Sequence, residues 1–171
     1  LTQFIRFIKD RFNRPIEYLE IGLGHAGMFR AMCEHVPIDL AITIDDCRVM
    51  EFAKARNRNL AALDDRGQRY TLTVSRTTPH VISRVLFNRC VDVAFVDGCH
   101  TYNGVRSDGL AVLSEMVAGG IIAFHDSIFY GEKGGVAQFI QEIEWGMVPG
   151  LRVVTKFEQV YGIVVCEVFK P

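Results

Sequence analysis

Polar side chains end the apolar runs of this sequence, and most of them are acids. The residues at these ends are Glu20, Asp45, Ser75, Asp97 and Asp126. A buried charge costs free energy unless it has a partner, and ligands of open α/β sheets bind beyond the carboxyl ends of the strands. The pattern therefore predicts a cationic or hydroxyl-rich ligand, or a metal ion, across one edge of a sheet.

The first of these acids opens a glycine-rich turn. Residues 20–27 read Glu-Ile-Gly-Leu-Gly-His-Ala-Gly, so Gly22, Gly24 and Gly27 have the GxGxxG spacing. Glycines permit a tight turn and a close approach of the backbone to a ligand. Glu20 would repel a pyrophosphate and attract S-adenosylmethionine (SAM), which carries an amino group and a sulfonium. The acid therefore favours SAM over NAD; the alternative is a glutamate paired with a lysine or a backbone amide.

Asp45 ends the second expected strand, 25 residues after Glu20. An acid at this place can accept hydrogen bonds from both ribose hydroxyls. Proteins that bind NAD and proteins that bind SAM share this contact. Asp45 therefore predicts a bound ribose but does not distinguish the two cofactors. The neighbouring Asp46 is instead expected to cap the following helix.

An acid, a glycine and a histidine follow the fourth expected strand, at Asp97, Gly98 and His100. His100 is the only side chain of this loop that can act as a base near neutral pH. The sequence therefore predicts His100 as a catalytic base next to Asp97. The alternative is a loop histidine that donates to a carbonyl group.

A second histidine and acid, His125 and Asp126, end the neighbouring strand. Because adjacent strand ends lie close together, Asp97 and Asp126 could share a divalent cation, and oxygen-rich sites of this kind suit Mg²⁺. A metal ion there would lower the pKa of a bound substrate hydroxyl. In the alternative without a metal, one aspartate orients the SAM amine and the other caps a turn.

Alternating strand and helix patterns position these side chains, which predicts an α/β fold with a mostly parallel sheet. The last two strands are predicted to be antiparallel to each other, because no crossover helix fits between them. The expected strands cover residues 16–21, 40–44, 70–74, 91–96, 121–124, 151–157 and 160–168.

Two of the expected helices follow the second and the fourth strand. One helix is expected to run from about Cys47 to Leu63, and another has an apolar face from Val105 to Met116. Gly119 and Gly120 are expected to end that second unit before the fifth strand begins.

The composition is that of a folded protein with balanced charge. Hydrophobic residues make up 49% of the chain, charged residues 23%, and the net charge is -1. A nucleic-acid binder usually carries a basic stripe, and a membrane span needs a longer apolar run, so neither partner is expected. The five cysteines form no CxxC pair, which argues against disulfides or structural zinc and favours the cytoplasm.

Three motifs together resemble the class I SAM-dependent methyltransferase superfamily. They are Tyr-Leu-Glu-Ile-Gly at 18–22, Phe-Val-Asp-Gly-Cys-His-Thr-Tyr at 95–102 and Gly-Gly-Ile-Ile-Ala-Phe-His-Asp at 119–126. The sequence is most similar to the small D-G-x-H-[ST]-Y branch, which is related to the macrocin-type and catechol-type O-methyltransferases. The resemblance implies a Rossmann-like, three-layer α-β-α sandwich. Its seven-stranded, mostly parallel sheet would have the order 3-2-1-4-5-7-6, with strand 7 antiparallel.

The resemblance also implies roles for individual residues. His100 falls where catechol-type relatives place a catalytic lysine, so it would be the general base, and Asp97, His125 and Asp126 would take the metal-ligand positions. The chain departs from the family pattern at Cys99, where an acid is usual. Together with the glycine turn, the implied cofactor-binding residues are Glu20, Gly22, Gly24, Gly27, Asp45, Ser75, Arg76 and Asp97.

The expected activity is SAM-dependent O-methylation of a small-molecule hydroxyl by a single domain that spans residues 1–171. A homodimer could supply acceptor-site walls that the chain lacks. Three rival hypotheses stay open: an NAD-dependent oxidoreductase, a SAM-binding module without catalytic activity, and a hydroxylase-type relative.

Overall fold

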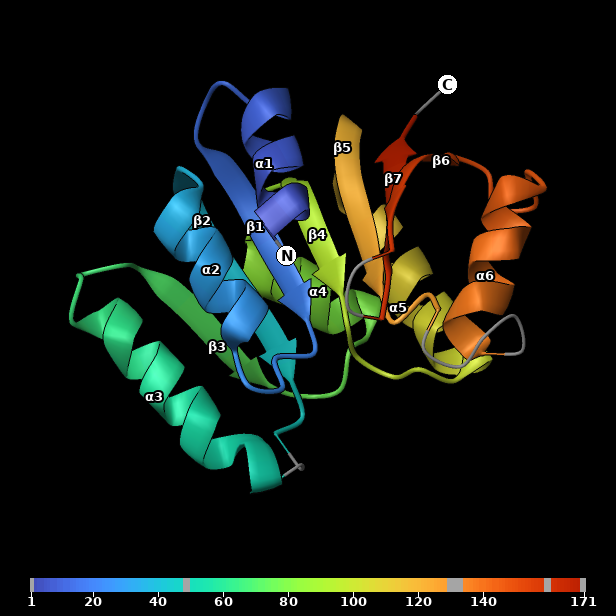
Figure 1. Ribbon diagram of the computed structural model, residues 1–171. Helices are drawn as coiled ribbons and strands as arrows, with labels where there is room; N and C mark the ends of the chain where they lie inside the picture. The colour runs from blue at the N-terminus through green and yellow to red at the C-terminus, as the bar shows by residue number, and fades with distance from the viewer. Residues whose placement is uncertain (1, 48–49, 129–133, 159–160, 170–171) are drawn as a thin grey trace.

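One seven-stranded sheet forms the centre of the molecule, in the order β3-β2-β1-β4-β5-β7-β6. The computed structural model describes residues 2–47, 50–128, 134–158 and 161–169. Strand β7 runs antiparallel to both of its neighbours, so the predicted Rossmann-like fold and strand order are confirmed. The strands (Figure 1) are β1 (Ile16–Ile21), β2 (Ile38–Asp45), β3 (Tyr70–Val74), β4 (Val91–Val96), β5 (Met116–His125), β6 (Leu151–Phe157) and β7 (Ile163–Val168).

Helices cover both faces of this sheet. Because successive strand residues point to opposite faces, Tyr18 of β1 joins the apolar cluster that includes α1, α2 and α3, whereas Leu19 joins the cluster that includes α4, α5 and α6. No helix in the described ranges combines the length and the apolar character that a bilayer span requires. The helices are α1 (Thr2–Arg11), α2 (Gly27–His35), α3 (Ala53–Asp64), α4 (Pro79–Leu86), α5 (Tyr102–Leu113) and α6 (Gly135–Glu144).

The parallel strands end side by side at one edge of the sheet. Ile21 of β1 pairs with Ile44 of β2 and with Val96 of β4, and Val96 pairs with Phe124 of β5. The residues that follow these four are therefore brought to the same edge. They are Gly22, Asp45, Asp97 and His125.

Strand β5 is longer than the sequence predicted. It begins at Met116 and continues through Gly119 and Gly120, with a register shift against β4, and Gly119 has a φ of +78° that permits this irregularity. Met116, predicted on the helix face, is fully buried as the first residue of the strand, and α5 ends at Leu113. An apolar residue is buried equally well in either element, so the pattern did not separate them.

The helix predicted from Cys47 begins later. Cys47 has a φ of +55°, which no right-handed helix accepts, and a 3-10 turn (Met50–Phe52) precedes α3. Arg48 and Val49, which the prediction included, lie outside the described residues. Leu60 is buried, as predicted for this helix, and Leu63 is buried with it, whereas Phe52 and Ala53, also predicted to face inward, are half-buried.

Candidate functional site

The glycine turn between β1 and α2 packs directly against the end of β4. Gly22 has a φ of +82°, and a Cβ placed on it would lie 2.2 Å from the Asp97 carbonyl oxygen. The Asp97 N–H donates to the Ile21 carbonyl at 2.8 Å, which holds the two segments together. In contrast, no described atom lies within 4 Å of a Cβ on Gly27. The turn is therefore packed at its first glycine and open at its last, where a ligand could approach the backbone.

Glu20 is buried where β1 faces α2, with 2% of its surface exposed. The Tyr18 hydroxyl donates to its carboxyl group at 2.5 Å, and the Phe29 backbone N–H also donates to it. Burial raises the pKa of Glu20 well above its usual range, and the charges of Asp97 and Asp45 add to this increase. Tyr18 is not among the site residues predicted from the sequence. The available signal was its spacing, since residues i and i+2 of a strand share a face.

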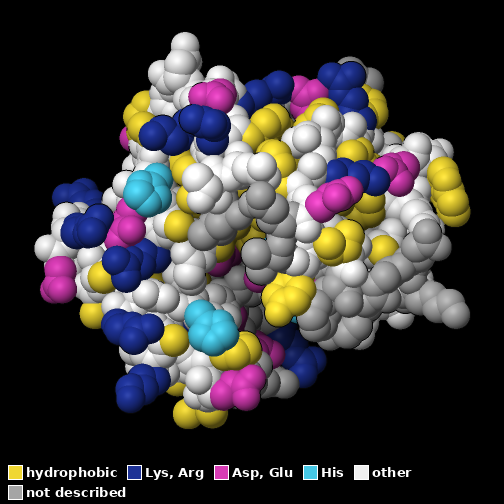
Figure 2. All heavy atoms as spheres, in the orientation of Figure 1, with side chains coloured by type: hydrophobic (Ala, Val, Ile, Leu, Met, Phe, Trp, Pro, Cys, Tyr) yellow, Lys and Arg dark blue, Asp and Glu magenta, His cyan; other side chains and the backbone are white. Residues whose placement is uncertain are grey.

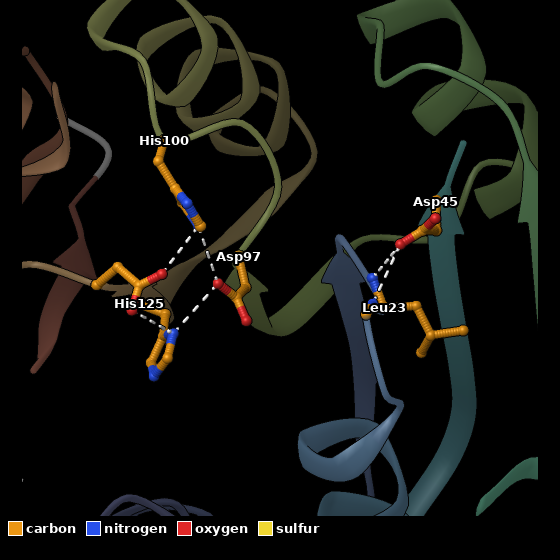
Figure 3. Close-up of polar contacts among 7 residues, drawn as sticks. Leu23, Asp45, Asp97, His100 and His125 are labelled. Atoms are coloured by element: carbon orange, nitrogen blue, oxygen red, sulfur yellow. Dashed lines mark hydrogen bonds and ion pairs between the residues drawn. The ribbon is translucent and has the colours of Figure 1, made fainter. Parts of the chain in front are cut away.

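Asp45 holds the glycine turn through backbone amides (Figure 3). Its Oδ2 accepts hydrogen bonds from the Leu23 N–H at 2.5 Å and the Gly24 N–H at 3.2 Å. Its Oδ1 accepts one from the Cys47 N–H. Burial would raise the pKa of Asp45, but these amides bring it below its usual value. The carboxylate is therefore ionised and joins the end of β2 to the turn after β1.

Ser75 and Arg76, which the family resemblance places near the adenine of the cofactor, lie next to Asp45. The Ser75 N–H donates to the Asp45 carbonyl at 3.1 Å, and the Ser75 hydroxyl donates to the Arg76 carbonyl at 3.1 Å. The Arg76 side chain is exposed. Ser75 and Arg76 therefore adjoin the predicted ribose-binding acid, on the β2–β3 side of the sheet edge.

Two histidines and two aspartates form a compact cluster beyond β4 and β5 (Figure 3). His100 Nε2 lies 3.3 Å from Asp97 Oδ1 and 3.0 Å from Asp126 Oδ2. His125 Nδ1 lies 3.2 Å from Asp97 Oδ1 and 3.2 Å from Asp126 Oδ1. Each imidazole thus contacts both carboxylates. All four residues were singled out in the sequence, and the structure brings them together.

These contacts shift the pKa values of the cluster. The hydrogen bond with Asp97 raises the pKa of His100, and the charge of Asp126 raises it further. Burial would lower the pKa of His125, but the hydrogen bond with Asp97 raises it overall. Burial would raise the pKa of Asp97, but the imidazoles lower it, whereas burial keeps the pKa of Asp126 raised. His100 therefore accepts a proton at a higher pH than an ordinary histidine does.

Three side chains of the cluster are close enough to share a metal ion. Ligand atoms of Asp97, His100 and Asp126 all lie within 4.8 Å of one another. The nitrogen ligand in this set is His100, whereas the family resemblance implied His125. Two carboxylates with an imidazole resemble the mixed ligand sets of Mn²⁺, Fe²⁺ or Zn²⁺ more than the oxygen shell that Mg²⁺ prefers.

Cys99, where the family pattern has an acid, points away from this cluster. Its Sγ lies 3.1 Å from the Thr101 hydroxyl oxygen, and a Cβ placed on Gly104 would lie 2.4 Å from the same sulfur. Thr101 caps α5 by accepting the Gly104 N–H at 3.2 Å. Cys99 therefore belongs to the start of α5, and its contacts are structural.

The sequence profile of a protein family described as a methyltransferase domain matches residues 19–127. This range contains the glycine turn, Asp45, the segment after β3 and all four residues of the cluster. No curated protein sequence matches the chain.

Solved structures share the fold over nearly the whole chain. The O-methyltransferase TomG from Streptomyces achromogenes, in complex with SAM, is 14% identical with a TM-score of 0.71, over 98% of this chain and 79% of that one. An rRNA methylase from Streptococcus thermophilus is 10% identical with a TM-score of 0.70, over 98% and 95%. An O-methyltransferase from Bacillus cereus, in complex with S-adenosylhomocysteine (SAH), is 15% identical with a TM-score of 0.69, over 98% and 80%. At these identities the likeness is one of fold.

Proposed function

Since the chain belongs to the methyltransferase domain family, we propose that it uses SAM to methylate a hydroxyl oxygen of a small-molecule acceptor. The observation that carries the proposal is the contact of the glycine turn with Asp97, whose side chain joins the two imidazoles. A group bound along the turn would reach this cluster. In support, the similar structures of TomG and of the Bacillus cereus enzyme are O-methyltransferases with SAM or SAH bound. We also propose that residues 1–171 form one catalytic domain.

The cofactor would lie along the edge formed by β3, β2, β1 and β4. Asp45 is ionised, and its Oδ1 accepts a hydrogen bond from the Cys47 N–H. A carboxylate oxygen can accept a second hydrogen bond, which leaves room for a ribose hydroxyl. The chain of contacts from the glycine turn through Asp45 to Ser75 supports one continuous binding surface. The residues that we propose for it are Glu20, Gly22, Gly24, Gly27, Asp45, Ser75, Arg76 and Asp97.

His100 is the proposed general base. When bound, SAM supplies a methyl group on a sulfonium, which a substrate oxygen can attack in line. The His100 Nε2–H faces the two carboxylates, so Nδ1 carries the lone pair and would take the proton that the acceptor hydroxyl loses as the new O–CH₃ bond forms. Asp97 and Asp126 would stabilise the resulting imidazolium. Alignment of the two reactants would supply much of the remaining rate enhancement.

A metal ion is the alternative proposal for the cluster, in which His100 is a ligand and not the base, and it can be tested without an acceptor. We expect the wild-type protein to bind Mn²⁺ more tightly than Mg²⁺, and we expect Asp126→Asn to weaken Mn²⁺ binding about tenfold or more, because a charged ligand is lost. Asparagine tolerates the φ of +57° at this position. Titration calorimetry measures both affinities. An Asn variant that binds Mn²⁺ like the wild type would show that the metal lies elsewhere.

The test of the proposed function is ligand binding by the whole chain. Calorimetric titration is expected to give micromolar Kd values for SAM and SAH and no binding of NAD, because the chain belongs to a methyltransferase domain family. Asp45→Asn should weaken SAH binding, since the ionised acid holds the turn. Binding of NAD instead of SAH would favour the oxidoreductase hypothesis.

Acceptors can then be screened with labelled SAM. Phenols, catechols and sugars represent the proposed class of small molecule, and a structured RNA should be included. The reason is that an rRNA methylase shares the fold, and that Lys and Arg side chains gather on the side of the molecule that carries α3 (Figure 2), where Lys54 and Arg58 are exposed. SAM binding without turnover on any acceptor would favour the non-catalytic module.

A further inference from the structure

Asp108 is a buried acid that the proposed reaction does not use. It lies in the middle of α5, and only 8% of its surface is exposed. Its carboxyl group faces the Cys99 backbone N–H and the Thr77 hydroxyl, and both groups favour its ionised form. A Cβ placed on Gly98 would lie 3.0 Å from its Oδ2. Asp108 therefore contacts two segments outside its own helix.

Each of these segments belongs to a different part of the proposed site. Cys99 lies in the loop between Asp97 and His100, whereas Thr77 follows Ser75 and Arg76 in the connection from β3 to α4. A single carboxylate thus joins the loop of the acid–imidazole cluster to the segment proposed for the adenine side.

The energetic cost of this arrangement calls for an explanation. Burial raises the pKa of Asp108 to about 6, and no described lysine, arginine or histidine contributes to its stabilisation. A leucine of similar volume would fill the same space without the cost of a buried acid. The acid is therefore explained by what its oxygens connect and not by packing.

We infer that Asp108 is a positioning residue. It fixes the 97–100 loop relative to residues 75–77, so that the bound cofactor and His100 are correctly placed relative to each other. Its effect on cofactor binding rests on the proposed function, but the coupling between the two segments does not. Asparagine could keep both contacts, because its oxygen can accept the Cys99 N–H and its amide can donate to the Thr77 hydroxyl.

The first test is amide hydrogen exchange, read by NMR on the whole chain. Asp108→Leu is expected to speed exchange at Cys99 about tenfold or more, the size of a lost hydrogen bond to a charged group. Thr77→Val is expected to speed it too, although Thr77 is 22 residues away in sequence. In Asp108→Asn, the exchange rate of the Cys99 amide should stay close to that of the wild type. The double variant should behave like Asp108→Leu alone, because the hydroxyl then has no carboxylate to contact.

Asp92→Asn is the matched control. Asp92 is also buried (3% exposed), but it pairs with Arg14 at the opposite end of β4. The Asp92→Asn substitution should lower the melting temperature without changing amide exchange at residues 98–101. Unchanged exchange at Cys99 in Thr77→Val, or additive effects in the double variant, would overturn the inference. These two variants decide the question even if Asp108→Leu does not fold.

The second readout is the affinity for SAH, measured by calorimetry. Asp108→Leu is expected to raise the Kd about tenfold, Thr77→Val less, and Asp92→Asn not at all. If the wild type binds SAH and Asp108→Leu binds it equally well, the positioning role is wrong. If the wild type does not bind SAH, the proposed function is wrong, and the exchange data alone then decide whether Asp108 couples the segments.

Discussion

Turnover is expected to fall about 10²- to 10⁴-fold when His100 is replaced by alanine, because general base catalysis contributes a factor of this size. SAM affinity should change little, since the glycine turn and Asp45 hold their contacts without the imidazole. Steady-state rates with an acceptor from the screen, together with SAH calorimetry, measure the two effects separately.

The pH dependence provides a second measurement of the same role. Only a neutral imidazole can accept the proton, and the contact with Asp97 raises the pKa of His100. The wild-type rate should therefore fall as the pH is lowered through a value above that of an ordinary histidine, about 6.5, and His100→Ala should lose this limb. His35→Ala, at an exposed histidine that ends α2, is the control. Loss of SAH binding in His100→Ala would contradict the assignment of the base.

The largest effect on stability is expected for Gly22→Ala. The new Cβ would lie 2.2 Å from the Asp97 carbonyl oxygen and 2.7 Å from the Gly98 Cα, and the residue would keep a φ of +82°. Backbone atoms cannot move aside as a side chain can, so we expect the free energy of unfolding to fall by an amount on the order of 4 kcal/mol. Denaturant titration measures this loss.

Gly27→Ala is the matched control within the same turn. A Cβ on Gly27 meets no described atom within 4 Å, and the residue begins α2. The unfolding free energy should stay level or rise by about 0.5–1 kcal/mol, because alanine favours a helix. Since Gly27 is proposed to face the cofactor, its SAH affinity should nevertheless fall. A Gly22→Ala protein with wild-type stability would show that the turn can move away from β4.

The residues that meet in the site could be predicted from the ends of the strands more than from single motifs. Asp97, His100, His125 and Asp126 could be predicted to meet because parallel strands end at one edge, and the alternation of strands and helices indicated which of them were neighbours. The choice between His100 and His125 as the third ligand could not be predicted. It depends on side-chain directions after the strands end, which periodicity does not determine.

Tyr18 and Asp108 show why the rest of the site was not predictable. Asp108 reads in the sequence as one polar position between apolar residues of a helix, and only the path of the loop before α5 brings the Cys99 N–H to it. Tyr18 reads as an apolar strand residue, although its hydroxyl contacts Glu20. Both depend on tertiary contacts that local patterns do not contain.

The hydrogen bonds between Asp45 and the glycine turn affect the rate at which a ligand can bind. The carboxylate fixes the Leu23 and Gly24 amides through contacts within the chain itself, so the loss of conformational entropy in the turn occurs during folding and not during association. Preorganised sites of this kind lose less freedom on binding. Association at this edge would therefore be limited by encounter and orientation more than by rearrangement of the turn.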